Sequence, residues 1–339
     1  MTLSGFIPEW EELAAAAIEP NVFYEHWMLL PALQAFGSDR DICFVLVLLR
    51  DLRNRQAPTK LGGLFPLEFV RSIDQLQQPA LSVWQPLDCP LGTPLIRADA
   101  VRECMGELLL WLRSGEAGAP QIELKWPSGD NLFRRAMRSL LPGCGLASWK
   151  DTATRGVLRR ARGLRPSLMP AMPDELRRRL ERKARRLSEH GRLERVVLKP
   201  GGDVHGWIDD FLRIEAGSWK GRCGRAPGWD SQYFQDVVGR AFERGQLLMV
   251  GIDLDGSPIA RSCALIADGG SFTFGTTFDE RYARFSPGVL LELEAVRQLD
   301  ALPGVDWIDA CSARQSILIN RLSNERKTIQ SLMIDGGTP

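Results

Sequence analysis

The sequence predicts a mixed α/β protein of two lobes, in which central sheets are flanked by helices. Three observations support this prediction. Segments with strand patterns alternate with segments of helical spacing along the whole chain. The 339 residues suffice for two domains that each bury a core. Residues 150–173, which contain three prolines and show no clear core pattern, separate the two halves. We therefore expect one lobe over residues 1–165 and a second over residues 166–339.

Apolar spacing assigns the elements of the first half. Helices are expected within residues 1–40, where Asn21 is a plausible cap, and over 98–113 and about 130–141. Strands are expected over 42–49, 61–70 and 121–126. The continuous apolar run of residues 42–49 is typical of a strand that is covered on both faces.

The second half begins with a basic helix, which Asp174 is expected to cap and Gly191 to end. Further helices are expected over 204–219, 230–244 and 287–299, and a short element over 317–322. Strands are expected over 193–199, 247–253, 259–267, 271–277, 305–309 and 328–334. Asp255 and Gly256 form a strong hairpin-turn signal between two of these strands.

Composition excludes several classes of protein. The apolar fraction of 44% and the charged fraction of 25% are ordinary for a globular domain. The net charge of +1 gives no global field that would attract nucleic acid. Seven scattered cysteines without a CxxC pair, and only three histidines, argue against a disulfide framework and a metal site. The first residues do not resemble a signal peptide, and the longest apolar run is too short to span a bilayer. We expect a cytoplasmic monomer or homodimer that needs no metal.

One segment departs from this neutral composition. Between Arg155 and Arg195 there are 14 basic and five acidic side chains, a local charge of +9. Such a segment suits contact with a polyanion, for example RNA, or with a phosphorylated ligand. No aromatic residue lies within it, so stacking on bases has no support there. We favour the alternative, a solvated helix whose charges are balanced elsewhere in the chain.

Residues 271–299 predict a strand, a charged loop and a helix. Phe272 and Phe274 alternate with polar residues, as in a strand with two different faces. Ser286 suits the N-cap position of the following helix, and Pro287 suits its first position. The first amides of a helix lack intrahelical partners, so a helix that starts just after a strand is a potential anion site.

Two arginines and one carboxylate stand out as functional candidates. Arg281 and Arg284 lie in the loop before this helix, where they would neutralise a second phosphate. Glu215 lies near a helix end, beside Trp219, Lys220 and several glycines, and is a candidate general base for an amine or hydroxyl. The alternatives are solvated arginines in the loop and, for the 211–224 segment, a helix C-terminus with a packed tryptophan.

Seven segments together point to one family. In the second half they are RRLSEHGRL (185–193), FLRIEAGSWKGRCG (211–224), TTFDERYARFSPGVLLELEAVR (276–297), VDWIDAC (305–311) and INRLSNERK (319–327). In the first half they are NVFYEHWMLL (21–30) and CPLGTPLI (89–96). With these segments the chain resembles the GNAT acyltransferases of the CelD/BcsL (BioF2-like) family, which is related to the FemABX transferases. The resemblance covers most of the chain, and SPGVLLELE is its most specific part. It implies two tandem GNAT-like lobes, the second with the acyl-CoA site.

The resemblance also implies a donor site. Acetyl-CoA or another acyl-CoA would bind to the strand end, the loop and the helix start, at Phe274, Gly275, Thr276, Arg281, Arg284, Phe285, Ser286, Gly288 and Val289. The sequence departs from the common pattern, because Gly288 is the one glycine of the turn and Pro287 has no N–H to donate. Phosphate binding would then depend more on Arg281 and Arg284.

Acyl transfer in this fold needs no covalent intermediate, only a bound acceptor, a base and a polarised carbonyl. Glu215 is the preferred base, and Asp309 is a second catalytic candidate. Tyr282 is a possible acid for the departing thiolate. Trp219, Lys220 and Asp279 are expected to contact the acceptor.

The sequence therefore predicts an acyl-CoA-dependent N- or O-acyltransferase. Its acceptor would be a sugar, a polysaccharide precursor or a similar small molecule, and the family context implies exopolysaccharide or cell-envelope metabolism. Two other interpretations stay open. In the first, a FemX-like transferase uses aminoacyl-tRNA, and the basic segment contacts the RNA. In the second, the chain is a catalytically silent GNAT-like binding module.

Overall fold

The computed structural model of the chain contains two compact units. Unit 1 comprises residues 1–154 and 328–339, and unit 2 comprises residues 155–327. The chain enters unit 2 within strand β6 (Ala147–Arg159) and leaves it within strand β12 (Glu325–Asp335). The structure describes residues 2–50, 59–71, 79–86, 89–127, 132–143, 147–161, 167–169, 172–218, 230–311, 317–323 and 325–336.

Unit 1 is built on a mixed sheet in which the strands follow the order β1–β2–β3–β5–β12, with β4 paired to β2. The bounds are β1 Ile42–Leu49, β2 Lys60–Val70, β3 Ala80–Val83, β4 Leu95–Ile96 and β5 Gln121–Pro127. β3 and β5 run parallel, whereas β12 returns antiparallel to β5. The last strand of the chain therefore completes the sheet of the first unit.

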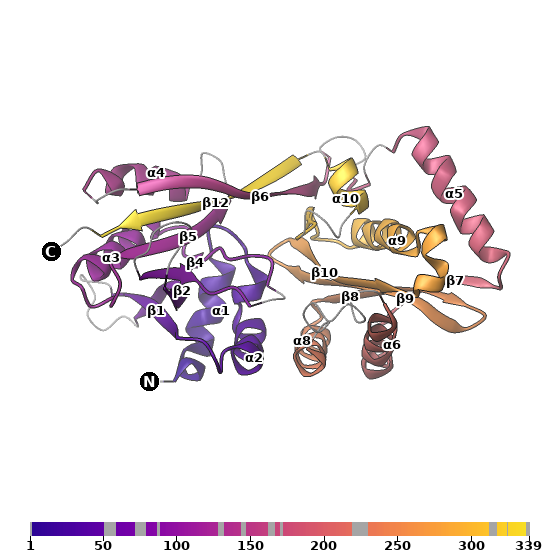
Figure 1. The fold of residues 1–339 in the computed structure, drawn as a ribbon, viewed down its shortest axis with the longest axis horizontal. Coiled ribbons are helices and arrows are strands. Elements are labelled where there is room, and N and C mark those ends of the chain that lie inside the picture. Colours follow the sequence, from indigo (N-terminus) through magenta and orange to yellow (C-terminus); the bar gives the residue numbers. More distant parts are fainter. Residues whose placement is uncertain are drawn as a thin grey trace. The chain divides into compact units, whose positions relative to one another are not determined.

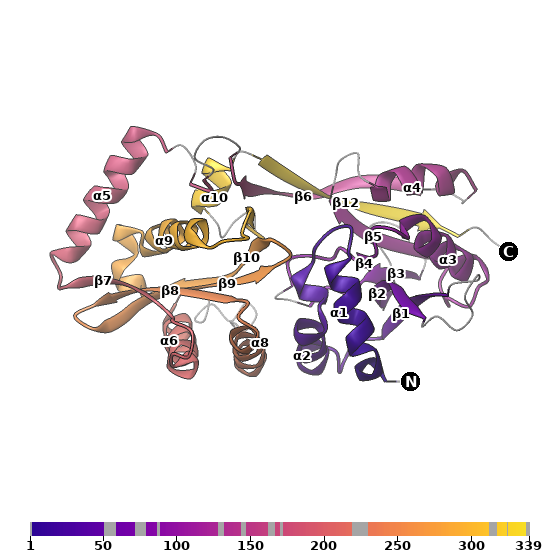
Figure 2. The ribbon, with the colours of Figure 1, turned by 180° about the vertical axis from the view of Figure 1, so that it is seen from behind.

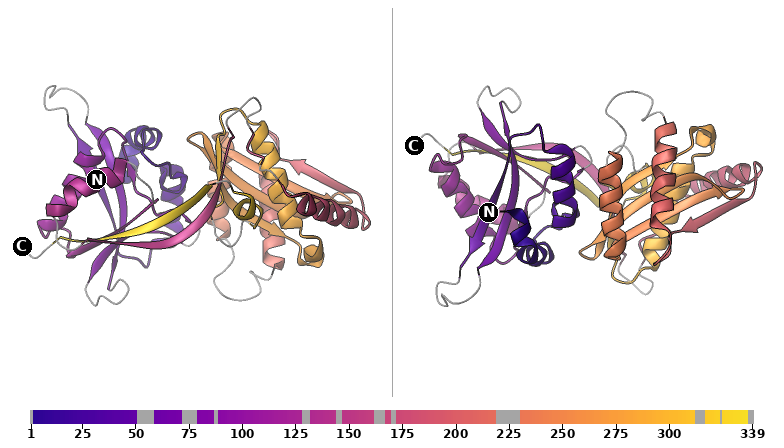
Figure 3. Two further views of the ribbon diagram at one scale, coloured as in Figure 1. Left: turned by 90° about the horizontal axis from the view of Figure 1, so that it is seen from above. Right: turned by 90° about the horizontal axis from the view of Figure 1, so that it is seen from below.

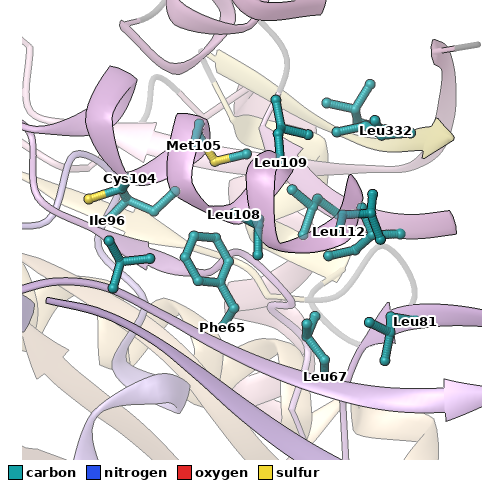
Figure 4. Close-up of a cluster of buried hydrophobic side chains, with 14 of the residues drawn as sticks. Phe65, Leu67, Leu81, Ile96, Cys104, Met105, Leu108, Leu109, Leu112 and Leu332 are labelled. Atoms are coloured by element: carbon teal, nitrogen blue, oxygen red, sulfur yellow. The ribbon is translucent and has the colours of Figure 1, made fainter. Parts of the chain in front are cut away.

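Helices cover this sheet and close its core. They are η1 (Leu3–Phe6), α1 (Ile7–Ala15), η2 (Val22–Tyr24), α2 (His26–Phe36), α3 (Val101–Arg113), α4 (Leu132–Leu140) and η3 (Leu141–Gly143). Asn21 does act as a cap, because its side chain accepts a hydrogen bond from the Phe23 amide at 3.1 Å. The buried face of α3 contributes Cys104, Leu108 and Leu112 to one cluster with apolar residues of the strands (Figure 4).

The expectation for β1 was wrong, and one strand was not expected. β1 is not covered on both faces, since it lies at the end of the strand order and most of its residues are only half-buried. Its unbroken apolar run thus belongs to an edge strand, and the Leu48 side chain is 47% exposed. β6 extends through residue 159, into the segment that was expected to separate the two halves. β6 was not expected, because its polar sequence lacks the apolar pattern by which strands are predicted.

Unit 2 has its own strand order, β6–β11–β10–β9–β8–β7. The further strands are β7 Leu193–Val197, β8 Leu247–Leu254, β9 Ser257–Ala267, β10 Gly270–Phe278 and β11 Trp307–Asp309. Asp255-Gly256 joins β8 to β9, and Asp268-Gly269 joins β9 to β10, with positive φ at all four residues. These are the dihedrals of two-residue hairpin turns, so the hairpin prediction at Asp255-Gly256 is confirmed.

The helices of unit 2 lie on both faces of its sheet. α6 (Val204–Gly217) and α8 (Ser231–Glu243) lie on one face, and α9 (Pro287–Ala301) lies on the other (Figures 1 and 2). Figure 3 shows the same arrangement from the two sides of the sheet. The remaining helices are α5 (Asp174–Ser188), η4 (Glu280–Phe285) and α10 (Ile317–Leu322). The mixed α/β fold with helix-covered sheets is thereby confirmed.

The ends of the basic helix α5 differ slightly from the expectation. Pro173 occupies the N-cap position and Asp174 is already the first helical residue, so Asp174 does not cap the helix. Its carboxylate instead pairs with Arg177 within the first turn. Leu180 and Leu187 are buried in the core of unit 2. α5 is thus an amphipathic helix anchored by a narrow apolar face.

Asp300, at the end of α9, fixes the segment that follows β6. Its carboxylate accepts hydrogen bonds from the Leu168 amide (2.7 Å) and the Ser167 hydroxyl (2.8 Å), and it pairs with Arg160 at 2.9 Å. Burial alone would raise the pKa of Asp300. The three donors outweigh that effect and hold its pKa below the usual value.

We expect Asp300→Asn to lower the free energy of unfolding by about 1.5–3 kcal/mol near neutral pH, because hydrogen bonds to a charged group are lost. The folded-state pKa lies below the unfolded one, so the stabilisation is present above about pH 4 and is lost as the pH falls through the folded value. Urea unfolding at several acidic pH values checks this. The variant should lose less stability on acidification than the wild type. Asp306→Asn is the matched control, because Asp306 is 73% exposed and only 3.6 Å from the same arginine; equal acid sensitivity of Asp300→Asn and the wild type would contradict the assignment.

Candidate functional site

β10 and β11 separate from each other partway along β10. They pair in parallel only from Gly270 to Phe272, opposite residues 307–309. β11 ends there, whereas β10 continues to Phe278 and stays paired with β9 on its other side. Within the described strands, the edge of β10 beyond Phe272 therefore has no partner in β11. A strand edge of this kind can pair with an extended ligand.

A β-bulge lies at the point of separation. Thr273 pairs with Ala264 and Gly275 pairs with Cys263, so Phe274 is the extra residue on β10. A bulge bends the strand and redirects its peptide groups. Residues 274–276, which belong to the predicted donor site, thus lie where β10 has left β11.

The first turn of α9 packs against the end of β10. A Cβ on Gly288 would lie 3.3 Å from the Phe278 ring and 3.9 Å from the Thr276 methyl group. The Ser286 carbonyl accepts hydrogen bonds from the Val289 and Leu290 amides at 3.1 and 3.2 Å. Pro287 has no N–H to donate. The Gly288 amide makes no hydrogen bond to a described residue, so it can donate to a ligand.

Ser286 holds the predicted N-cap position but does not cap the helix. Its backbone is left-handed (φ 54°, ψ 53°), and its side chain accepts no hydrogen bond from the first turn. The hydroxyl instead accepts a hydrogen bond of 2.5 Å from the Lys183 ammonium of α5. Sequence reasoning missed Lys183, because it is one of 14 basic residues in its segment. The structure places its charge at the start of α9.

The two arginines of the loop have different partners. Arg281 forms a close pair with Asp279, whose pKa is held below its usual value chiefly by the hydrogen bond from Arg281. Arg284 lies 4.7 Å above the Phe285 ring and donates to His190 Nε2 at 3.0 Å. An acceptor at Nε2 places the histidine proton on Nδ1, which donates to a backbone carbonyl of α5. Asp279 and Arg281 thus neutralise each other, whereas Arg284 keeps its positive charge.

Glu215 lies on the opposite face of the sheet from Gly288. Phe211 of α6 stacks on Phe234 of α8 (4.4 Å between ring centroids), and Phe234 stacks on Phe274 of β10 (6.0 Å). Glu215 follows Phe211 by one helical turn and therefore points to the same side of α6. Its side chain is buried, at 4% exposed. The buried Glu215 carboxylate therefore lies on the same face of the sheet as the Phe274 side chain.

Asp309, the second candidate base, is engaged in the core. Its carboxylate lies 2.6 Å from the Arg155 Nε and accepts a hydrogen bond from the Cys311 amide at 2.8 Å. The two side chains of the ion pair are 6% and 1% exposed. The pair joins β6 to β11, and this engagement leads us to prefer Glu215.

We expect Asp309→Asn to lower the free energy of unfolding by about 3–5 kcal/mol, because Arg155 is left buried without its counter-charge. Denaturant unfolding checks this. The double variant Arg155→Met/Asp309→Leu should recover much of the loss. Glu325→Gln is the matched control: it removes the exposed partner of Arg159 and should cost less than about 1 kcal/mol. If the Asp309→Asn variant is as stable as the wild type but inactive, Asp309 acts in catalysis and not in stability.

The other predicted residues fall into two groups. Tyr282 packs against the apolar cluster on the α9 side, and the structure gives no contact between it and Glu215. Trp219 and Lys220 lie outside the described residues. Searching the described ranges finds no group of three or more metal-binding side chains. No helix among those described combines the length and apolar character needed to cross a membrane.

One family model matches part of the chain. Residues 174–314 match the family model described as "Acetyltransferase (GNAT) domain". The matched residues make up less than half of the chain and are similar to a GNAT acetyltransferase domain. The match spans α5 through β11 and thus includes Lys183, Glu215 and the start of α9. The match supports the prediction that the protein is an acyltransferase.

Solved structures extend the likeness of fold to the whole chain. A conserved protein of unknown function from Bacteroides thetaiotaomicron VPI-5482 is similar with a TM-score of 0.57 and 9% identity, over 97% of each chain. FemX is similar with a TM-score of 0.51 and 10% identity, over 95% of each chain. At these identities the likeness is one of fold alone. No curated protein matches the sequence.

Proposed function

We propose that the protein is an acyl-CoA-dependent N- or O-acyltransferase whose donor site lies in unit 2. The observation behind this proposal is the separation of β10 from β11, next to the first turn of α9. An acyl-CoA has an anionic pyrophosphate, an arm with two amide groups and a terminal thioester. An anion site that continues along a strand edge suits that order of groups, because an extended amide chain pairs with the edge of a strand.

Three groups would bind the pyrophosphate. Gly288 supplies an amide, and Lys183 and Arg284 supply positive charge. With Pro287 at the first helical position the turn offers few amides, so the side chains contribute more of the binding than in a glycine-rich turn. Lys183 donates one of its three protons to Ser286 and keeps two for the ligand.

The acyl group would then lie at the bulge. A backbone amide of residues 274–276 would polarise the thioester carbonyl while an amine or hydroxyl attacks its carbon. The C–N or C–O bond forms, the C–S bond breaks, and the sulfur leaves as the thiolate of coenzyme A. Glu215 would remove the proton of the attacking group from the α6 side of the sheet. Tyr282 remains a candidate acid for the thiolate.

The acceptor would be a sugar, a polysaccharide precursor or a similar small molecule with an amine or hydroxyl. This part of the proposal rests on the resemblance to the CelD/BcsL family. On the same basis we propose a role in exopolysaccharide or cell-envelope metabolism.

Calorimetric titration with acetyl-CoA, longer acyl-CoAs and free coenzyme A tests the donor. We expect binding by the wild type and a loss of affinity of at least about 10-fold in Lys183→Ala/Arg284→Ala, because charged contacts to phosphate are removed. Arg281→Ala/Asp279→Asn is the matched control, since it removes both charges of an ion pair and leaves the net charge of the loop unchanged. If none of these ligands binds, the proposal is contradicted. Retardation of tRNA in a gel-shift assay would then favour an aminoacyl-tRNA donor.

A further inference from the structure

The exposed face of α5 carries a strip of arginines. Five of them are exposed: Arg178, Arg179, Arg182, Arg185 and Arg186. Arg177, their neighbour, is paired with Asp174 and Glu181. None of the five lies within ion-pair distance of an acidic group in the part of the chain that the structure describes.

Helical geometry places the five side chains on one face. At 3.6 residues per turn they occupy roughly a third of the helix circumference, over a length of about 12 Å. The apolar residues Leu180 and Leu187 point the other way, into the core of unit 2. Lys183, the single lysine of α5, also turns away from this face, toward Ser286. The basic strip is therefore separate from the donor site.

This arrangement is unfavourable for an isolated helix. Arg182 lies three or four residues from each of the other four arginines, and like charges at these spacings repel. The helix dipole favours positive charge in the last turn and so accounts for Arg185 and Arg186. It does not account for Arg178, Arg179 and Arg182. Packing of the apolar face against the core stabilises α5. The positive charge of its exposed face is not balanced by nearby acidic side chains among the described residues.

We infer that this face is a docking surface for an anionic lipid membrane. Guanidinium groups bind phosphate in a bidentate manner, and a cluster of four to eight basic residues on an amphipathic helix is typical of binding to anionic headgroups. α5 contains no aromatic, Asn or Gln side chain that would stack on or read bases, which favours lipid over RNA. Because the apolar residues are buried in the core, the contact is electrostatic, peripheral and reversible. The inference does not depend on the proposed acyl donor.

Vesicle sedimentation tests it. At low salt the wild type should bind phosphatidylcholine vesicles that contain about a third phosphatidylglycerol, and it should dissociate from them at about 1 M salt. It should not bind vesicles of pure phosphatidylcholine. Each arginine near the surface should contribute about 5-fold to the partition coefficient, so Arg182→Gln/Arg185→Gln/Arg186→Gln should lower it by about 100-fold. Glutamine keeps the helix propensity of arginine, so that α5 should stay folded.

The control changes the same charge elsewhere. Arg50, Arg71 and Arg102 are exposed arginines of unit 1, and Arg50→Gln/Arg71→Gln/Arg102→Gln should bind vesicles like the wild type. Equal loss in both triple variants would overturn the inference, as would failure of the wild type to bind at low salt. Binding of tRNA that is lost in the α5 triple variant, without vesicle binding, would assign the surface to RNA instead.

Discussion

Replacing Gly288 by leucine is expected to abolish the binding of acetyl-CoA while unit 2 stays folded. A side chain at this position would occupy the space beside the amide that we assign to the pyrophosphate. The contact between an amide and a charged phosphate is worth about 1.5–3 kcal/mol, so its loss alone lowers the affinity by about 10- to 150-fold. Exclusion of the phosphate from the helix start should add to this. Calorimetric titration measures the effect.

The substitution also presses on the Phe278 ring, which we expect to cost about 1–3 kcal/mol of stability. Circular dichroism and thermal unfolding must therefore accompany the titration. Gly239→Leu in α8 is the matched control, because a Cβ at Gly239 meets no atom within 4 Å. It should leave both the fold and the affinity unchanged. A folded Gly288→Leu protein with wild-type affinity would remove the start of α9 from the donor site.

Glu215→Gln is expected to lower kcat by about 10²- to 10⁴-fold, the usual contribution of a general base. Glutamine has nearly the same size as glutamate but cannot take up the proton of the acceptor. The affinity for acetyl-CoA should not change, because the donor binds from the α9 side of the sheet. The measurement is release of the coenzyme A thiol, with an acceptor selected from a panel of amino sugars and small amines.

Asp209→Asn separates this role from a general effect of charge on α6. Asp209 lies on the same helix but is exposed, so its substitution should leave kcat unchanged. A Glu215→Gln variant with kcat within about 3-fold of the wild type would mean that water or another group removes the proton.

Local patterns in the sequence predicted much of unit 2. Asp255-Gly256 marks its hairpin because few other residue pairs accept positive φ at both positions. α9 begins at Pro287, as expected from the fixed φ of proline, and its apolar stripe is buried. Where a local rule and the tertiary environment agree, the prediction is confirmed.

The errors arise where distant residues determine the local structure. β6 is polar in sequence, and its place in the sheet depends on β11 and on the ion pair of Arg155 with Asp309. Ser286 adopts a left-handed conformation and binds Lys183, which lies 103 residues earlier in the chain. No local pattern distinguishes Arg281 from Arg284 either, since only the folded loop pairs the first with Asp279.

Hydrogen–deuterium exchange with and without saturating acetyl-CoA tests the central claim most directly. The proposed site predicts slower exchange in two places, residues 273–278 of β10 beyond its pairing with β11 and the amides at the start of α9, with little change in unit 1. Protection confined to other segments, at a concentration that calorimetry shows to be saturating, would contradict the placement of the donor between β10 and α9.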